Sequence, residues 1–121
     1  MAAHFDQTTL GTLRDAPEVR MHTSAGPRRG TVIWVVVVGD AVFVRSVRGP
    51  GAKWYSAALA ERQATLSLDD RRWPVEVVPV PDQDAIARVS LAYLAKYATS
   101  PYAQPMVHDE ILSTTLRLDP R

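Results

Sequence analysis

The first half of the chain shows a pattern of apolar and polar positions that is typical of β-strands. Charged and apolar residues alternate over Glu18–Thr23, which predicts a half-buried strand. Thr31–Val38 is apolar on both faces and rich in β-branched residues, which predicts a central strand covered on both sides. Gly39-Asp40 is a two-residue hairpin signal, so we expect Ala41–Val47 to return beside the central strand.

The second half of the chain predicts one more hairpin and a last strand. Ala64–Leu68 and Trp73–Val80 have strand patterns on either side of a turn at Asp69–Arg72, and Leu112–Leu118 follows near the end. Strands that are joined by hairpins pair antiparallel. Six strands in a short chain, one of them apolar on both faces, therefore predict a mainly β (α+β) fold with a small antiparallel barrel.

Helical patterns occur before, between and after the hairpins. Asp6 is suited to cap a helix that ends near Ala16-Pro17, and a short helix is expected over Trp54–Arg62. Over Asp84–Ala98, apolar residues recur at the helical period and form one stripe. We therefore expect helices to flank the barrel, in a single domain that covers residues 1–121.

Composition narrows the classes of function. The net charge is +1, so no strong global field favours nucleic acid, and any anion site must be local. The chain has no cysteine, and its three histidines lack metal-ligand spacing, so we expect no metal site. The longest apolar run, Val32–Val38, is too short to span a bilayer. We expect a cytoplasmic protein with no membrane partner.

The most unusual stretch is VRSVRGPGAKWY, which follows a strand and leads into a helix. Arg45, Arg48 and Lys53 supply positive charge, Gly49 lets the backbone approach a ligand, and a helix start favours an anion. These are the parts of a phosphate site. The alternative is a solvated, charged turn from which Trp54 packs into the core, and the local pattern alone does not decide between the two.

A second basic turn, at Arg28 and Arg29, lies before the central strand. If the strands 31–38 and 41–47 pair through their hairpin, the start of one lies beside the end of the other. We therefore expect Arg28 and Arg29 to come close to Arg45 and Arg48. Solvated arginines with acidic partners remain the alternative.

The central motif resembles a family of small uncharacterised bacterial proteins, domain of unknown function 2255. The residues that carry this resemblance are Ile33–Val36, Val38–Asp40, Phe43–Ser46, Arg48–Pro50 and Trp54-Tyr55. The later stretches AYLAKYATSPYAQPMV and TTLRLDPR are also similar to that family.

More distantly, GPRRGT and RGPGAKW are similar to the two basic turns of split-barrel oxidoreductases that bind FMN or the deazaflavin F420. That resemblance implies a split β-barrel, a homodimer, and a cofactor in a groove at the dimer interface. The residues that it implies for cofactor binding are Arg28, Arg29, Thr31, Arg45, Ser46, Arg48, Gly49, Lys53 and Trp54.

The leading prediction is a flavin- or F420-binding protein that acts as an oxidoreductase on a small molecule. In that chemistry the cofactor carries the hydride, so no catalytic side chain is assigned. Two alternatives stay open. One is a non-redox isomerase or lyase, for which His22, Tyr102 and His108 are the first candidates. The other is a non-catalytic module that binds a phosphorylated or acidic small ligand.

Overall fold

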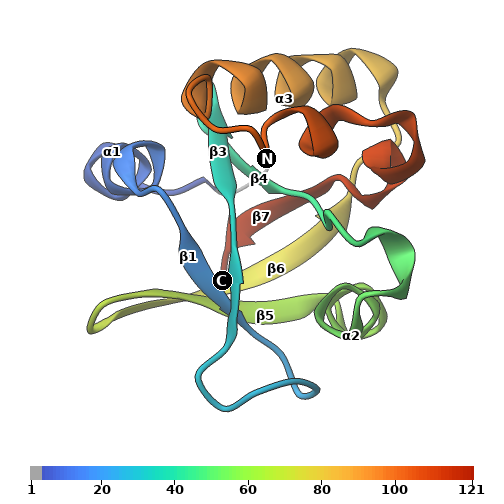
Figure 1. The fold of residues 1–121 in the computed structure, drawn as a ribbon. Coiled ribbons are helices and arrows are strands. Elements are labelled where there is room, and N and C mark those ends of the chain that lie inside the picture. Colours follow the sequence, from blue (N-terminus) through green and yellow to red (C-terminus); the bar gives the residue numbers. More distant parts are fainter. Residues whose placement is uncertain (1–3) are drawn as a thin grey trace.

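The computed structural model describes residues 4–121, which form a mostly antiparallel, nearly closed barrel with helices around it (Figure 1). The strands are β1 (Val19–His22), β2 (Thr31–Ile33), β3 (Val35–Val38), β4 (Ala41–Val44), β5 (Gln63–Leu68), β6 (Arg71–Pro79) and β7 (Leu116–Pro120). The α-helices are α1 (Gln7–Asp15), α2 (Lys53–Glu61) and α3 (Gln83–Lys96). Short 3₁₀ helices are η1 (Gly49–Gly51), η2 (Gln104–Val107) and η3 (Asp109–Thr114).

The barrel closes through the predicted central strand, which breaks at Trp34 into β2 and β3. The strand order is β2-β1-β5-β6-β7-β4-β3, and every pair is antiparallel. β2 pairs with β1, whereas β3 pairs with β4 from Val38↔Ala41 to Val35↔Val44. β2 and β3 thus stand at the two ends of the strand order, and because they follow each other directly in the chain, they bring the two ends of the sheet together.

Two apolar cores lie on the two faces of the β3–β4 hairpin. Val35 points into the barrel, where it packs with residues of all the surrounding strands and of α1 and α2. Val36 points the other way, into a second cluster with Tyr93 of α3 and Tyr97, the residue that caps the end of α3. Both valines are fully buried, so the β3 part of the predicted strand is covered on both sides. In the β2 part Val32 is exposed, and β2 and β3 lie at the two ends of the strand order, not at its centre. Figure 1 shows α3 lying across one end of the barrel.

The first helix follows its sequence signals. The side chain of Asp6 accepts a hydrogen bond from the backbone N–H of Thr9, 2.7 Å long, and this bond lowers the pKa of the Asp6 carboxyl. The helix ends at Asp15, with Ala16 as its C-cap.

The final strand starts later than its pattern predicts. The segment 112–114 belongs to η3, and β7 begins only at Leu116. The hydroxyls of Thr114 and Thr115 donate to the carbonyls of Ile111 and Leu112, three residues earlier, and so support a helical turn. The β-branched threonines, which favour a strand by propensity, instead stabilise the turn that precedes it.

Candidate functional site

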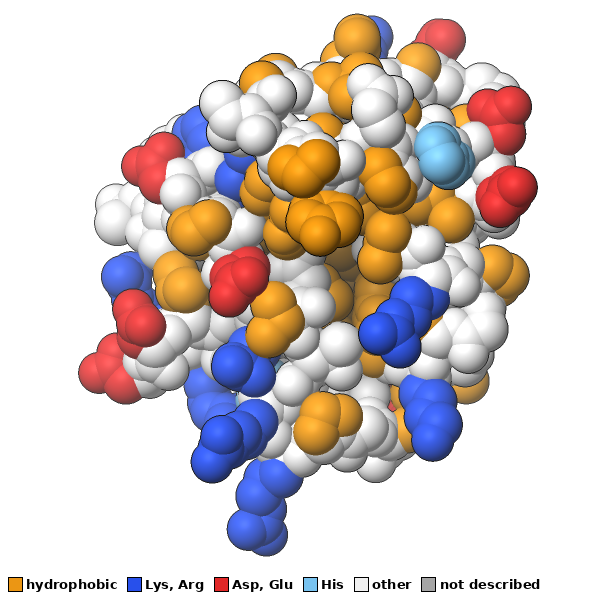
Figure 2. Space-filling model, viewed as in Figure 1, with side chains coloured by type: hydrophobic (Ala, Val, Ile, Leu, Met, Phe, Trp, Pro, Cys, Tyr) orange, Lys and Arg blue, Asp and Glu red, His pale blue; other side chains and the backbone are white. Residues whose placement is uncertain are grey.

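A groove opens where β2 and β4 separate. The pairing of β3 with β4 ends at Val35↔Val44, and in the part of the chain that the structure describes β2 pairs with β1 alone, so its other edge has no partner strand. The groove has a volume of about 1000 Å³. β2 forms one wall and residues 47–54 form the other. Figure 2 shows the hollow near the centre of the face, lined largely by apolar side chains.

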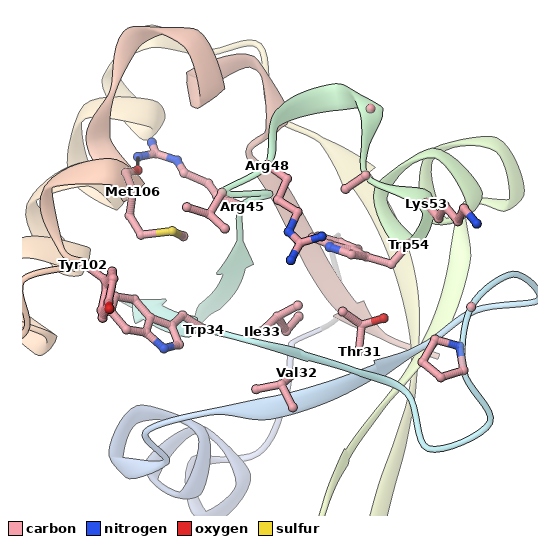
Figure 3. A pocket seen from close by; sticks show the side chains of 15 residues that line it. Thr31, Val32, Ile33, Trp34, Arg45, Arg48, Lys53, Trp54, Tyr102 and Met106 are labelled. Atoms are coloured by element: carbon pink, nitrogen blue, oxygen red, sulfur yellow. Dashed lines mark hydrogen bonds between the residues drawn. The ribbon is translucent and has the colours of Figure 1, made fainter.

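The two ends of the groove differ in chemistry (Figure 3). Trp34, Tyr102 and Met106 lie together at one end, which is apolar. Thr31, Arg48, Lys53 and Trp54 lie toward the other end, with the glycine and proline of the turn at 26–27. Figure 3 shows the guanidinium of Arg48 directed toward the centre of the groove, whereas the Lys53 side chain points outward at its end. A ligand with a flat apolar part and an anionic part would match this division.

Trp34 is held rigidly at the apolar end. Its indole stacks on the ring of Tyr97, with centroids 3.7 Å apart and planes within 5°. Tyr97 is fixed in turn because its hydroxyl donates to the carbonyl of Pro17 at 2.7 Å, and burial raises its pKa to about 12. The hydroxyl of Tyr93 donates to the carbonyl of Trp34 at 3.0 Å. One indole face therefore rests on α3 while the remaining surface lines the groove.

Lys96 fixes the backbone beside this aromatic pair. Its ammonium donates to the carbonyls of Val35 and Leu13, at 2.6 and 3.1 Å. Burial lowers the Lys96 pKa to about 8, against a smaller opposing effect of Asp15. The same ammonium lies 5.4 Å from the centre of the Tyr97 ring. The platform under Trp34 is thus braced by polar contacts as well as by packing.

The wall opposite β2 is shaped by a turn that two of the predicted site residues, Ser46 and Gly49, close. The hydroxyl of Ser46 donates to the carbonyl of Gly49 at 2.6 Å, and the Gly49 N–H donates to the Ser46 carbonyl at 2.9 Å. Gly49 has a φ of +80°, which favours glycine. Neither residue lines the groove. They lie behind the wall, where their mutual hydrogen bonds fix the backbone of the turn that carries Arg48.

Arg45 was expected to face the ligand, but its guanidinium points into the protein. The side chain is only 2% exposed. It donates hydrogen bonds of 2.8–3.0 Å to four oxygens: Thr115 Oγ1, Ser90 Oγ, and the carbonyls of Met106 and Ile86. Burial lowers the pKa of Arg45. Arg45 borders the groove, yet every polar contact that its guanidinium makes here ties β4 to α3, η2 and the start of β7.

The turn with Arg28 and Arg29 also differs from the expected arrangement. Its residues Gly26 and Pro27 line the end of the groove, whereas Arg28 and Arg29 are exposed and do not line it. The two basic turns therefore border one groove, although the strand pairing expected to bring them together stops at Val35↔Val44, and only Arg48 and Lys53 of these turns bring free cationic side chains to it.

Several residues that line the groove were not predicted from the sequence. Trp34 was predicted only as part of the apolar strand 31–38, although an indole at the centre of a β-branched run is the signal that could have singled it out. Met106 and Val47 carry no such signal. Of the candidates for acid–base chemistry, Tyr102 lines the groove, whereas His22 and His108 do not.

The mouth of the groove exposes large apolar side chains. Val47 is 54% exposed and Tyr102 is 69% exposed, and Val32 on the β2 wall is also exposed.

Within residues 4–121, no group of three or more His, Asp or Glu side chains is placed to hold a metal ion. Every helix in this part of the chain is too short or too polar to cross a membrane.

Comparisons with known proteins agree with this fold. A family model described as "Uncharacterized protein conserved in bacteria (DUF2255)" matches residues 9–118. A search of curated proteins finds no match. Among solved structures, a conserved hypothetical protein from Mycobacterium tuberculosis has a TM-score of 0.66 at 13% identity, with 97% of this chain and 79% of that chain covered. An FAD-binding protein from Mycobacterium smegmatis has a TM-score of 0.52 at 20% identity, with coverages of 98% and 91%.

Proposed function

We propose that this chain, which belongs to the DUF2255 family, binds a flavin or deazaflavin cofactor in the groove and serves as an oxidoreductase for a small molecule. One observation carries the proposal: the split of the barrel presents a braced aromatic surface, Trp34, and a free guanidinium, Arg48, to the same groove. The FAD-binding protein from Mycobacterium smegmatis, which has a similar fold, supports it.

The residues present fit the two parts of such a cofactor. A planar ring system would lie against Trp34 and Tyr102, because aromatic surfaces stack favourably and exclude water. A phosphate would lie near Arg48, where a guanidinium makes charge-assisted hydrogen bonds, with Thr31 and Lys53 close by. A volume of about 1000 Å³ is at the upper end of typical cofactor and ligand pockets.

The chain's own residues would bind and orient the cofactor rather than transfer protons. Within residues 4–121, the side chains that line the groove include no carboxylate and no histidine. A bound flavin or deazaflavin would supply hydride transfer. Trp34 would hold the ring at a fixed depth, and Met106 and Val47 would keep water from its edge.

The experiment is a titration of the purified protein with FMN, FAD and F420, each followed by its absorbance or fluorescence. We expect at least one to bind, and Arg48→Ala to weaken that binding by about 10- to 100-fold, because charge-assisted hydrogen bonds to the phosphate are lost. The matched control is Arg88→Ala, which removes an exposed arginine of α3 that does not line the groove.

A folded protein that binds none of the three cofactors would overturn the proposal. Equal loss of affinity in Arg48→Ala and Arg88→Ala would remove Arg48 from the site. A bound cofactor that no small-molecule substrate reoxidises or reduces would contradict the oxidoreductase activity and favour a binding module.

A further inference from the structure

The basic turn at Arg28 and Arg29 lies beside a different surface, the outer face of β1, β5 and β6. The strand register places Arg20 opposite Ser67, and Ser67 opposite Arg72. Directly opposed residues project from the same face of a sheet. The neighbouring Met21 and Leu66 are fully buried in the barrel, so the row Arg20–Ser67–Arg72 faces outward.

His22 connects this row to the basic turn. Its Nε2 lies 2.7 Å from the Ser67 hydroxyl oxygen, in hydrogen-bond contact. The imidazole ring also packs under Gly30: a Cβ at that position would lie 2.9 Å from the ring carbon Cε1. Gly30 has a φ of +80°, which a side chain would strain. The turn therefore packs on His22, which places the backbone of Arg28 beside the strand that carries Arg20.

In the described part of the chain, no carboxylate lies within ion-pair distance of Arg20, Arg28 or Arg72. Within residues 4–121 the single ion pair joins Arg117 to Asp119. Burial, and then the positive charges of Arg72 and Arg20, lower the pKa of His22, while a backbone contact to Arg28 opposes them. On the other side of His22 lie Glu61, which accepts a hydrogen bond from Ser24, and Arg121.

Figure 2, which shows the face with the groove, has basic side chains gathered at the lower left, near acidic ones and apart from the basic side chains at the right. Like charges held together cost free energy, and an anion between them removes that cost. Arginine suits this role because its guanidinium matches phosphate geometry.

We propose that Arg20, Arg72 and the turn that carries Arg28 form an anion site on the outer face of the barrel, specific for a small phosphorylated or polyphosphate ligand and separate from the groove. His22 is a positioning residue of this site, because it holds the turn in place through Gly30 and Ser67. The site uses neither Arg48 nor Lys53, so it stands independently of the cofactor proposal.

Binding at this site is linked to protonation. Burial, and then the charges of Arg72 and Arg20, lower the pKa of His22 and so favour its neutral imidazole. A bound anion offsets their charge and favours the imidazolium, so its binding raises the pKa of His22 and takes up a proton. This linkage gives the site a readout that the groove does not share.

The test uses inorganic pyrophosphate as the probe and follows the histidine ring protons of the whole chain by NMR through a pH titration. His22→Gln assigns the His22 signal, and His108, exposed after η2, is the internal reference. We expect millimolar pyrophosphate to raise the His22 pKa by about one unit and to leave His108 unchanged. Arg20→Gln with Arg72→Gln should abolish that shift, whereas Arg48→Ala should preserve it.

Three results would overturn the proposal. The first is an unchanged His22 pKa at millimolar pyrophosphate. The second is an equal rise in sodium chloride of the same ionic strength, because screening alone would then explain it. The third is a shift that survives in the double variant and disappears in Arg48→Ala, which would assign phosphate binding to the groove. If the double variant melts at a lower temperature than the wild type, Arg72→Gln alone replaces it, and this single variant should still reduce the rise in the His22 pKa.

Discussion

At the scale of single residues, Arg45 and Arg48 have different roles although they lie only three residues apart in the sequence. Arg45 leaves the end of β4 and is buried, where its planar guanidinium satisfies oxygens from three other elements. Arg48 is exposed in the following turn and borders the groove. A buried cation without a carboxylate is costly, and the hydrogen bonds that Arg45 donates offset that cost. Arg45 therefore acts on stability, and Arg48 is available to a ligand.

The two arginines therefore differ in their expected effect on folding. Arg45→Ala should lower the free energy of unfolding by about 2–4 kcal/mol, because it leaves a cavity and unpaired oxygens. Arg48→Ala should change it by less than about 0.5 kcal/mol, as is usual for an exposed side chain. Urea unfolding followed by tryptophan fluorescence measures both. Similar small changes in the two variants would contradict a structural role for Arg45.

At the scale of elements, the groove depends on two departures from regular strands. The predicted strand 31–38 breaks at Trp34, where Tyr93 and Lys96 of α3 bind the carbonyls of Trp34 and Val35. The strand 41–47 ends at Val44 and passes into the turn that Ser46 and Gly49 close. Both departures move the chain away from the barrel at the same place, so the wall of the groove is set by these contacts.

Position 49 is the place in this turn where the backbone conformation favours glycine. Gly49→Ala should lower the free energy of unfolding by about 1–2 kcal/mol, because its φ of +80° strains any side chain although no atom lies within 4 Å of the added Cβ. Gly51→Ala is the matched control, since it also has open space and its φ is not positive. Thermal unfolding of the two variants compares them. A loss as large in Gly51→Ala would show that backbone strain at Gly49 is not the cause.

At the scale of the whole molecule, the groove opens at a surface that carries exposed apolar side chains. Val47 and Tyr102 stand at its mouth, more than half exposed. Exposed apolar surface of this kind is common where a partner or a ligand binds. The split-barrel resemblance implied a homodimer, and a second copy of the chain laid over the groove would cover these side chains and shield a bound cofactor from water.

We therefore expect a dimer in solution that depends on this surface. Val47→Glu should convert the dimer to a monomer, because it would bury an unpaired carboxylate at the interface. Leu91→Glu is the matched control, because Leu91 is 66% exposed on α3 and does not line the groove. Light scattering after gel filtration measures the mass. A wild-type monomer, or equal dissociation by the two variants, would contradict this interface.

Local patterns predicted the regular elements well. The two hairpins, the antiparallel barrel and the flanking helices follow from alternation, from turn residues such as Gly39-Asp40, and from the helical stripe of α3. The site was harder to predict because its chemistry depends on side-chain direction. A sequence shows that Arg28, Arg29, Arg45 and Arg48 are basic, but not which of them the packing turns inward, outward or toward a neighbouring face.

The sequence by itself therefore determined the approximate places of the strands and helices and the presence of two basic turns, because these depend on short-range periodicity and turn chemistry. The tertiary structure alone decided where the barrel splits, which arginine is buried, and that Trp34 lines the groove. Those outcomes depend on contacts with α3, η2 and η3, which lie 40 to 70 residues away along the chain. Such contacts join positions that no local pattern relates.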